Sequence, residues 1–292
     1  MSYSVFTRIE DAYYDLSKSH KKIADYVLEN YEIAAFLTAA KLGEATNISV
    51  STVVRFATSL GYEGYPEFQE ALRETIKGKL TSTQRIEVAG TQILDNDLLT
   101  SVLQKDRDLI RTTLTSISKD DFEKASKAIN NAKSIYIVGV RSASALASFL
   151  FFYFKMIYDD VRLLDHNSSS EMFEEIYRIG PEDVCIAFSF PRYSKHVLNV
   201  VKYASDKGAG TIAITDNDDS PIAGLSNYTL VAKSNMVSFV DSLTAPLSIV
   251  NALIVSSARG RRSATKKNLA ELEKIWQEYN IYETMEDAHS DE

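Results

Sequence analysis

The sequence predicts an α/β protein in two parts: an all-α helix-turn-helix domain, then a parallel β-sheet with helices on both faces. Up to about residue 77, apolar residues recur only at helical spacing. Between about residues 129 and 254, short β-branched runs alternate with helical segments, which is the pattern of a parallel sheet. A chain of 292 residues is also long enough for two domains. We therefore assign residues 1–77 to the first domain, 78–96 to a linker and 97–292 to the second domain, whose sheet core is at about 129–254.

The composition is that of a soluble protein with a substantial core, since 45% of the residues are hydrophobic and 25% are charged. A net charge of −8 argues against coating nucleic acid by bulk electrostatics, although a local patch could still bind a specific site. Cys185, the only cysteine, excludes an intrachain disulfide and stands in an apolar run, so we expect a buried, inert thiol. No apolar stretch reaches the roughly 20 residues that a bilayer requires, and no apolar leader is present. We expect a cytoplasmic protein without membrane contact.

Two helices are expected ahead of the helix-turn-helix. The first covers about residues 2–16 and is partly amphipathic. The second is expected to be capped by Ser19 and to carry Ile23 and Val27 on one side. Both should pack behind the segment that follows.

The stretch from Thr38 to Gly61 has the features of a helix-turn-helix. Thr38 can cap a first helix, because its hydroxyl accepts a hydrogen bond from an amide of the first turn. Asn47 tolerates positive φ and can end that helix, and Ser49 can cap the next one. Gly61 can end the second helix. The apolar stripe expected on this second helix consists of Val53, Phe56, Ala57 and Leu60.

The second of these helices has the composition of a DNA recognition helix. A helix in the major groove needs short polar residues and a cation near its N-terminal end, and no carboxylate to repel phosphate. Residues 45–62 contain one arginine and no acidic residue. The periodicity alone also fits an ordinary helical hairpin within a larger all-α domain. The candidate DNA-binding residues are Ser49, Ser51, Thr52 and Arg55.

The chain then passes through a helix and a linker into the second domain. Gly64 and Pro66 mark a turn, and Pro66 stands near the first position of the helix that follows. Residues 78–96 lack periodicity and are rich in turn-forming types, so they are assigned to the linker. Helices are expected at residues 97–117 and 121–131.

Four short apolar runs are expected to form the strands of the sheet. These strands are residues 134–140, 183–188, 210–214 and 227–231. The helices expected between them are residues 144–158, 170–179 and 194–207.

Three further segments bear on assembly and on DNA contact. The helix containing FLFFYF and the stripe around Trp276 could each be core or subunit interface, and we assign the first to the core. Residues 259–267 hold five cations and no acid. They could contact DNA phosphate, but a solvated connection between elements is the simpler interpretation.

The first candidate ligand loop is residues 139–144 (GVRSAS), which follows the first predicted strand. Ligands of such sheets bind at the carboxyl ends of the strands, where loops and helix N-termini meet. Gly139 lets the backbone turn closely, and Ser142 and Ser144 can donate to an anion that the helix N-terminus already favours.

The second candidate loop is residues 189–194 (SFPRYS), which follows the strand DVCIAF. It offers hydroxyls and a cation suited to phosphate, from Ser189, Arg192, Tyr193 and Ser194. Either loop alone could be only a helix cap, but two of them on one sheet favour a ligand site. Further candidates to line it are Thr215, Asp216 and Asp241, although Asp216 could instead cap a turn.

Residues 38–76, with SVSTVVRFATSLGYEGYPEFQEAL at their centre, closely resemble the N-terminal domain of the RpiR/MurR-type transcription regulators. That family joins a helix-turn-helix to a sugar isomerase (SIS) domain. Residues 129–254, with GVRSAS, SFPRYS and IAITDNDDSP, are similar to a SIS domain, so the resemblance covers most of the chain. It implies a phosphosugar ligand whose phosphate lies near Ser142 of the first loop and near Ser189, Arg192, Tyr193 and Ser194 of the second.

The second loop departs from the pattern of many SIS domains. They have a glycine-containing serine loop at this place, whereas Phe190 and Pro191 stand here. One branch of the RpiR-type regulators does carry an SFPRYS pattern. Because proline stiffens the loop, the ligand pose is expected to differ from that in the sugar isomerases.

The sequence favours a regulator over an enzyme. Isomerisation needs a general base over the anchored sugar, and the candidates Glu171, Glu174, Glu175 and His196 form no evident constellation. We therefore predict no catalytic residue, metal site or cofactor. The prediction is a sequence-specific DNA-binding transcription regulator of sugar or amino-sugar metabolism, controlled by a phosphosugar. The alternative is a phosphosugar isomerase with a helical assembly domain.

The resemblance also implies partners. A helix-turn-helix protein of this kind is expected to bind a near-palindromic operator as a homodimer or homotetramer. The identity of the sugar and of the operator stays open. So does whether the protein activates or represses, and whether the ligand releases it from DNA or promotes binding.

Overall fold

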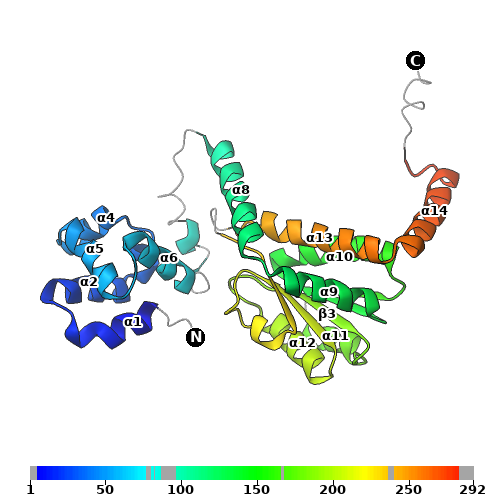
Figure 1. The fold of residues 1–292 in the computed structure, drawn as a ribbon, viewed down its shortest axis with the longest axis horizontal. Coiled ribbons are helices and arrows are strands. Elements are labelled where there is room, and N and C mark those ends of the chain that lie inside the picture. Colours follow the sequence, from blue (N-terminus) through cyan, green and yellow to red (C-terminus); the bar gives the residue numbers. More distant parts are fainter. Residues whose placement is uncertain are drawn as a thin grey trace, which may run out of the picture. The chain divides into compact units, whose positions relative to one another are not determined.

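The computed structural model describes residues 5–76, 80–81, 83–86, 97–165, 168–235 and 240–282. The chain forms two compact units (Figure 1). The first unit comprises Met1–Val102 with Met236–Asp241, and the second comprises Leu103–Asn235 with Ser242–Glu292. Most of the predicted linker, residues 78–96, lies outside the described residues.

Residues 5–76 of the first unit form helices joined by short turns, as predicted. Its helices are α1 (Val5–Ala12), α2 (Lys18–Glu29), α3 (Tyr31–Ala34), α4 (Ala39–Thr46), α5 (Val50–Ser59) and α6 (Tyr65–Ile76), with a short 3₁₀ turn at Tyr13–Asp15. The predicted cap of α2 was wrong by two residues, because the Ser17 hydroxyl, not that of Ser19, accepts from the His20 amide at 3.3 Å. The fully buried rings of Phe56 and Phe68 meet edge to face at the centre of the core.

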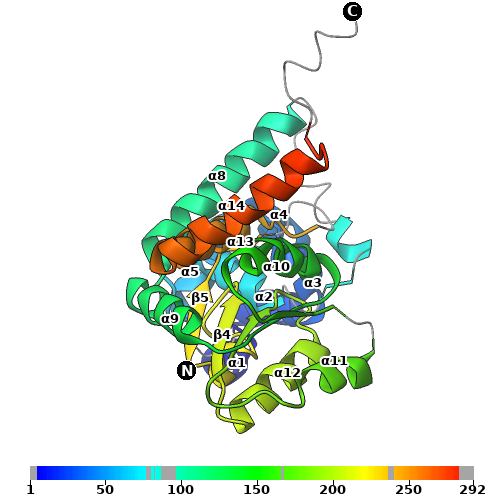
Figure 2. The same cartoon turned by 90° about the vertical axis from the view of Figure 1, so that its right-hand side faces the viewer.

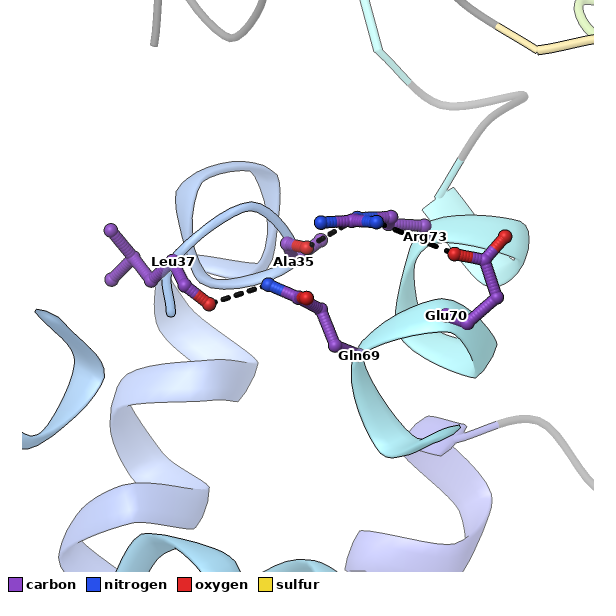
Figure 3. A network of polar contacts seen from close by, with 5 residues as sticks. All are labelled: Ala35, Leu37, Gln69, Glu70 and Arg73. Atoms are coloured by element: carbon purple, nitrogen blue, oxygen red, sulfur yellow. Dashed lines mark hydrogen bonds and ion pairs between the residues drawn. The ribbon is translucent and has the colours of Figure 1, made fainter. Parts of the chain in front are cut away.

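Helix α6 holds the segment that leads into the helix-turn-helix (Figure 3). The Arg73 guanidinium donates to the carbonyl of Ala35 at 3.0 Å, and the Gln69 amide donates to that of Leu37. The Tyr65 hydroxyl also donates to the Leu37 carbonyl, at 2.7 Å. These bonds satisfy backbone groups just before the cap of α4 and so fix where that helix begins.

The second unit is built on a five-stranded parallel sheet of order β2-β1-β3-β4-β5. The strands are β1 (Ile135–Gly139), β2 (Val161–Leu164), β3 (Val184–Phe188), β4 (Gly210–Thr215) and β5 (Tyr228–Val231). Four of them lie where the sequence predicts strands. The fifth, β2, was not predicted: it is an edge strand of four mostly half-buried residues in which Arg162 interrupts the apolar run.

Helices cover both faces of the sheet, as predicted (Figure 2). One face carries α9 (Lys119–Asn131), α10 (Ser144–Ile157) and α13 (Thr244–Gly260), and the other carries α11 (Ser169–Ile176) and α12 (Lys195–Asp206). Alternate residues of β1 supply the two cores, with Ile135 and Ile137 on the first face and Tyr136 and Val138 on the second. The fully buried Cys185 lies in the second core, where burial raises the pKa of its thiol to about 12 and fits the expected inert role.

Two further long helices are α8 (Leu98–Ser116), which belongs to the second unit from Leu103 onward, and α14 (Arg262–Glu278). The basic run 259–267 is mostly exposed and contains the junction of two elements, as expected, but it is largely helical: it forms the end of α13 and the first turns of α14, which meet at Arg261. Helix α10 buries one side, as expected for a core helix, but leaves Phe152 and Tyr153 exposed. Within the described part of the chain, no helix is both long and apolar enough to cross a membrane.

Candidate DNA-binding and ligand-binding sites

The helix-turn-helix forms with the predicted caps. The Thr38 hydroxyl accepts from the amide of Lys41 at 3.3 Å, and the Ser49 hydroxyl accepts from that of Thr52 at 3.4 Å. Asn47 ends α4 with φ of 54°, as its tolerance of the left-handed region predicts. Gly61, with φ of 86°, follows the last residues of α5.

The turn between α4 and α5 depends on a close backbone approach at Gly43. A Cβ atom at this position would lie 2.6 Å from the carbonyl oxygen of Ile48. The Ile48 amide donates to the Gly43 carbonyl at 2.8 Å, which holds the turn closed. On the other side of the turn, the predicted stripe of α5 is buried, formed by Val53, Phe56, Ala57 and Leu60.

The opposite face of α5 is a compact polar surface. The Ser49 hydroxyl lies 3.0 Å from that of Ser51 and 2.8 Å from that of Thr52. The Arg55 guanidinium donates to the Ser51 carbonyl at 3.3 Å and to the Thr52 hydroxyl at 3.4 Å. All four predicted DNA-binding residues therefore share one end and one face of the helix.

Two apolar residues on this face were missed from the sequence. Val50 is 48% exposed and Val54 is 37% exposed. Valine methyl groups on a recognition helix can contact the methyl group of thymine. Their positions in α5 lie outside the predicted buried stripe, and this is the sequence signal that could have identified them.

In the second unit, the two serine loops follow the neighbouring strands β1 and β3. The strand order changes direction between β1 and β3, since the chain proceeds from β1 to β2 on one side and then to β3 on the other. Ligands of open parallel sheets bind outside the carboxyl ends of the strands at such a switch point. Gly139 and Phe188, the last residues of β1 and β3, are paired directly. The loops that follow them therefore begin side by side.

The first loop turns sharply at the end of β1. A Cβ atom on Gly139 would lie 2.8 Å from the Ala143 carbonyl, which explains the glycine. Arg141 has φ of 58°, an uncommon backbone conformation for a residue with a side chain. The Ser144 hydroxyl donates to the Arg141 carbonyl at 2.6 Å and stabilises the turn, while Ser142 is exposed.

The second loop contains a buried polar group with no partner. Ser189 is 3% exposed, and its hydroxyl oxygen makes no hydrogen bond with any described residue. Arg192 has φ of 68° and an exposed side chain. The Ser194 hydroxyl accepts from the His196 amide at 3.2 Å and so caps α12. This is the helix-cap role that the sequence left open for the loop. Because a buried hydroxyl is rarely left without a partner, Ser189 marks this loop as a candidate ligand contact.

A third loop, after β4, joins this site. The carboxylate of Asp216 is 2% exposed and accepts from the Tyr193 hydroxyl and from the Asn217 amide, each at 2.9 Å. The Lys233 ammonium, beyond the end of β5, lies 3.5 Å from the Asp216 carbonyl. The hydroxyl of Ser220 in the same loop is also buried without a partner. Asn217 and Ser220 stand in the segment IAITDNDDSP but were not predicted as site residues, and Lys233 was missed because its place beside this loop depends on the strand order.

The other candidates take separate positions. Asp241 belongs to the first unit, where its carboxylate accepts from the Arg85 guanidinium at 2.8 Å. The glutamates of α11, Glu171, Glu174 and Glu175, are exposed, as is His196. Among the described residues, no group of three or more metal-ligating side chains comes together.

Two family models match the chain and account for both units. Residues 3–79 match the helix-turn-helix domain of the rpiR family, and residues 128–256 match the SIS domain. The chain belongs to the RpiR-type transcription regulators. In this RpiR-type regulator, the candidate DNA-binding face of α5 lies in the first matched domain and the two serine loops lie in the second.

Relatives of the same type extend over most of the chain. An uncharacterized HTH-type transcriptional regulator of Haemophilus influenzae is 26% identical over 232 residues, which are 78% of this chain and 79% of the relative. One of Clostridium perfringens is 23% identical over 232 residues, 79% of this chain and 82% of the relative.

Solved structures share the fold. The sugar isomerase domain of an RpiR transcription factor from Sphaerobacter thermophilus has a TM-score of 0.59 at 24% identity, covering 61% of this chain and 99% of that one. The NanR protein of Vibrio vulnificus, complexed with ManNAc-6P, has a TM-score of 0.55 at 21% identity, covering 94% of this chain and 98% of that one.

Proposed function

We propose that this regulator binds a phosphosugar at the β1/β3 edge of its sheet and that the ligand controls its binding to an operator. The observation that carries the proposal is the partnerless, buried hydroxyl of Ser189 at the switch point of the sheet. A phosphate oxygen there would accept the hydrogen bond that this hydroxyl lacks. The ManNAc-6P bound by the Vibrio vulnificus neighbour supports the same ligand class.

We assign the two ends of the ligand, its phosphate and its sugar hydroxyl groups, to different loops. We assign the phosphate to the serine loops, with the Arg192 guanidinium as counter-charge and with hydroxyl contacts from Ser142, Ser189 and Ser194. The Ser144 hydroxyl already donates to the Arg141 carbonyl, so we assign Ser144 to holding the first loop. The Tyr193 hydroxyl already donates to Asp216, so we assign Tyr193 to positioning that carboxylate beside the ligand. Asp216, an acceptor, and Asn217, which carries an amide, suit the hydroxyl groups of a sugar.

The proposed DNA contacts come from the exposed face of α5. We propose that Ser49, Ser51, Thr52 and Arg55 enter the major groove, with Arg55 as the residue that can bind a guanine edge in bidentate geometry. The helix dipole and the absence of acids in the first turn favour phosphate nearby.

Two copies would contact the two halves of a near-palindromic operator, about one helical turn apart. The second unit supports self-association, because an apolar set on its helices is exposed in the monomer. This set comprises Phe152, Val255, Leu269, Ile275 and Tyr279. A ligand with different affinities for two arrangements of such an assembly would change the spacing of the recognition helices and hence the affinity for DNA.

A thermal-shift screen tests the ligand site. The purified chain is heated with a panel of sugar phosphates and the matching unphosphorylated sugars. We expect a rise in melting temperature with phosphorylated compounds only, because a ligand at 100 times its Kd stabilises the native state by about 2.7 kcal/mol. No rise at millimolar concentration, or an equal rise with the unphosphorylated sugar, would contradict the site.

The same compounds separate a regulator from an enzyme. We propose that this chain has no isomerase activity, and we expect the compound that stabilises it to be recovered unchanged after incubation. Conversion to an isomer by the wild-type chain, lost in Ser189→Ala, would instead support the isomerase alternative.

A further inference from the structure

His20 lies beside the recognition helix although it is 35 residues away in sequence from Arg55. It stands in the first turn of α2, and its ring meets the ring of Phe56 edge to face with centroids 5.7 Å apart. Phe56 is fully buried and adjoins Arg55 in α5. The half-buried imidazole therefore lies at the border between the core and the exposed face of α5.

The cation that acts on His20 is Arg55. Burial and the charge of Arg55 lower the pKa of the imidazole. The first turn of α2 contains no acid, and the exposed Lys18 and Lys22, each two positions from His20, project from other sides of the helix. Farther along α2, the carboxylate of Asp25 accepts from the Tyr13 hydroxyl at 2.6 Å.

We propose that His20 is a DNA-backbone contact, whose imidazolium donates to a phosphate at the edge of the groove that α5 enters. The inference rests on the proposed DNA binding by α5. Phosphate contacts from elements flanking a recognition helix fix its register on the duplex. The positive charge of Arg55 near the ring suits such a phosphate, and a histidine there can supply a charged donor only when it is protonated.

The contact couples DNA binding to proton uptake. In the free protein, Arg55 and burial favour the neutral imidazole, whereas a phosphate next to the ring favours the charged form. The pKa of His20 is therefore higher in the complex than in the free protein. DNA affinity should be greatest at a pH below the free-state pKa and should fall as the pH rises through the pKa of the complex. Each unit of difference between the two pKa values corresponds to about tenfold in affinity.

A competing explanation gives His20 only a packing role against Phe56. It predicts that replacing His20 changes the melting temperature but leaves the pH dependence of DNA binding as in the wild type. Two substitutions separate the explanations. His20→Gln removes the titratable charge, and His20→Lys keeps a positive charge at every pH tested.

The experiment uses the full chain and a duplex enriched by it from a random-sequence pool, with fluorescence anisotropy from pH 5.5 to 8.0. We expect wild-type affinity to fall several-fold, up to about tenfold, over this range. His20→Gln should bind several-fold more weakly than wild type at pH 5.5 and equally at pH 8.0. His20→Lys should bind with nearly constant affinity. His196→Gln, the same change in the second unit, should retain the wild-type profile.

The proposal is overturned if folded His20→Gln retains the wild-type pH profile, or if the wild-type affinity does not change with pH. If circular dichroism shows that His20→Gln is unfolded, the pH profiles of DNA affinity of the wild type and of His20→Lys still test the proposal. Failure to enrich any duplex overturns DNA binding itself, and this contact with it.

Discussion

The hydroxyl of Tyr193 donates to the buried carboxylate of Asp216 at 2.9 Å and so joins the loop after β3 to the loop after β4. The same hydroxyl accepts from the Asn217 amide at 3.0 Å. These bonds tie the loop after β3 to the loop after β4. The carboxylate of Asp216, the proposed acceptor for the sugar, is therefore held in position within the protein itself.

Tyr193→Phe removes one donor from Asp216 and should lower the free energy of unfolding by about 1–3 kcal/mol, because the carboxylate stays buried with fewer partners. Affinity for the phosphosugar should fall as well. Urea unfolding and ligand titration measure the two effects. Tyr203→Phe is a matched control, since the Tyr203 hydroxyl donates to the Tyr177 carbonyl outside the loops and is exposed. Equal ligand affinity in Tyr193→Phe and wild type would show that the network has no part in binding.

Ser189→Ala should leave the free protein as stable as wild type or slightly more stable, because the hydroxyl it removes is buried without a partner. The thermal shift produced by the phosphosugar should disappear. Ser126→Ala provides the control: this hydroxyl on α9 is likewise buried and unpartnered but lies away from the loops. A shift that survives in Ser189→Ala would place the ligand elsewhere.

Gly43→Ala should disrupt the helix-turn-helix. The added Cβ would lie 2.6 Å from the Ile48 carbonyl, a backbone atom that can move only if the turn moves. We expect a loss of about 1–3 kcal/mol in unfolding free energy, as for overpacked sites, and weaker DNA binding. Gly224→Ala, where nothing lies within 4 Å of the new atom, should have little effect in the same assays. Wild-type DNA binding by Gly43→Ala would mean that this turn does not position α5.

Arg55→Ala should weaken binding to the selected duplex by about 1–3 kcal/mol more than binding to a random duplex, because a base contact carries sequence information. Competition titrations at fixed salt measure both affinities. An equal loss on the two duplexes would reassign Arg55 to a phosphate contact.

Local chemistry explains why much of this fold could be predicted. The caps at Thr38 and Ser49 and the left-handed Asn47 depend on neighbouring residues only, so the sequence pattern is sufficient. The cap of α2 was misassigned because Ser17 and Ser19 both stand near the start of the helix and either hydroxyl could serve. The short edge strand β2 has too few buried residues for a clear period.

The candidate ligand site was predictable only in part. Hydroxyl-rich loops after strands can be recognised from the local sequence, and Ser189 and Ser194 were predicted in this way. The bond from Tyr193 to Asp216 depends on β3 and β4 being neighbours, and the position of Lys233 depends on β5 following β4 in the sheet. Strand order is a property of the whole fold, so single-loop patterns do not contain it.

The most direct test of ligand-controlled DNA binding is the affinity of the full chain for its selected duplex, measured by fluorescence anisotropy with and without the phosphosugar found by thermal shift. A regulatory coupling of ordinary strength predicts a change of about 5–150-fold, in either direction, that is absent in Ser189→Ala. An unchanged affinity at saturating phosphosugar, in a protein that binds both partners, would contradict the account.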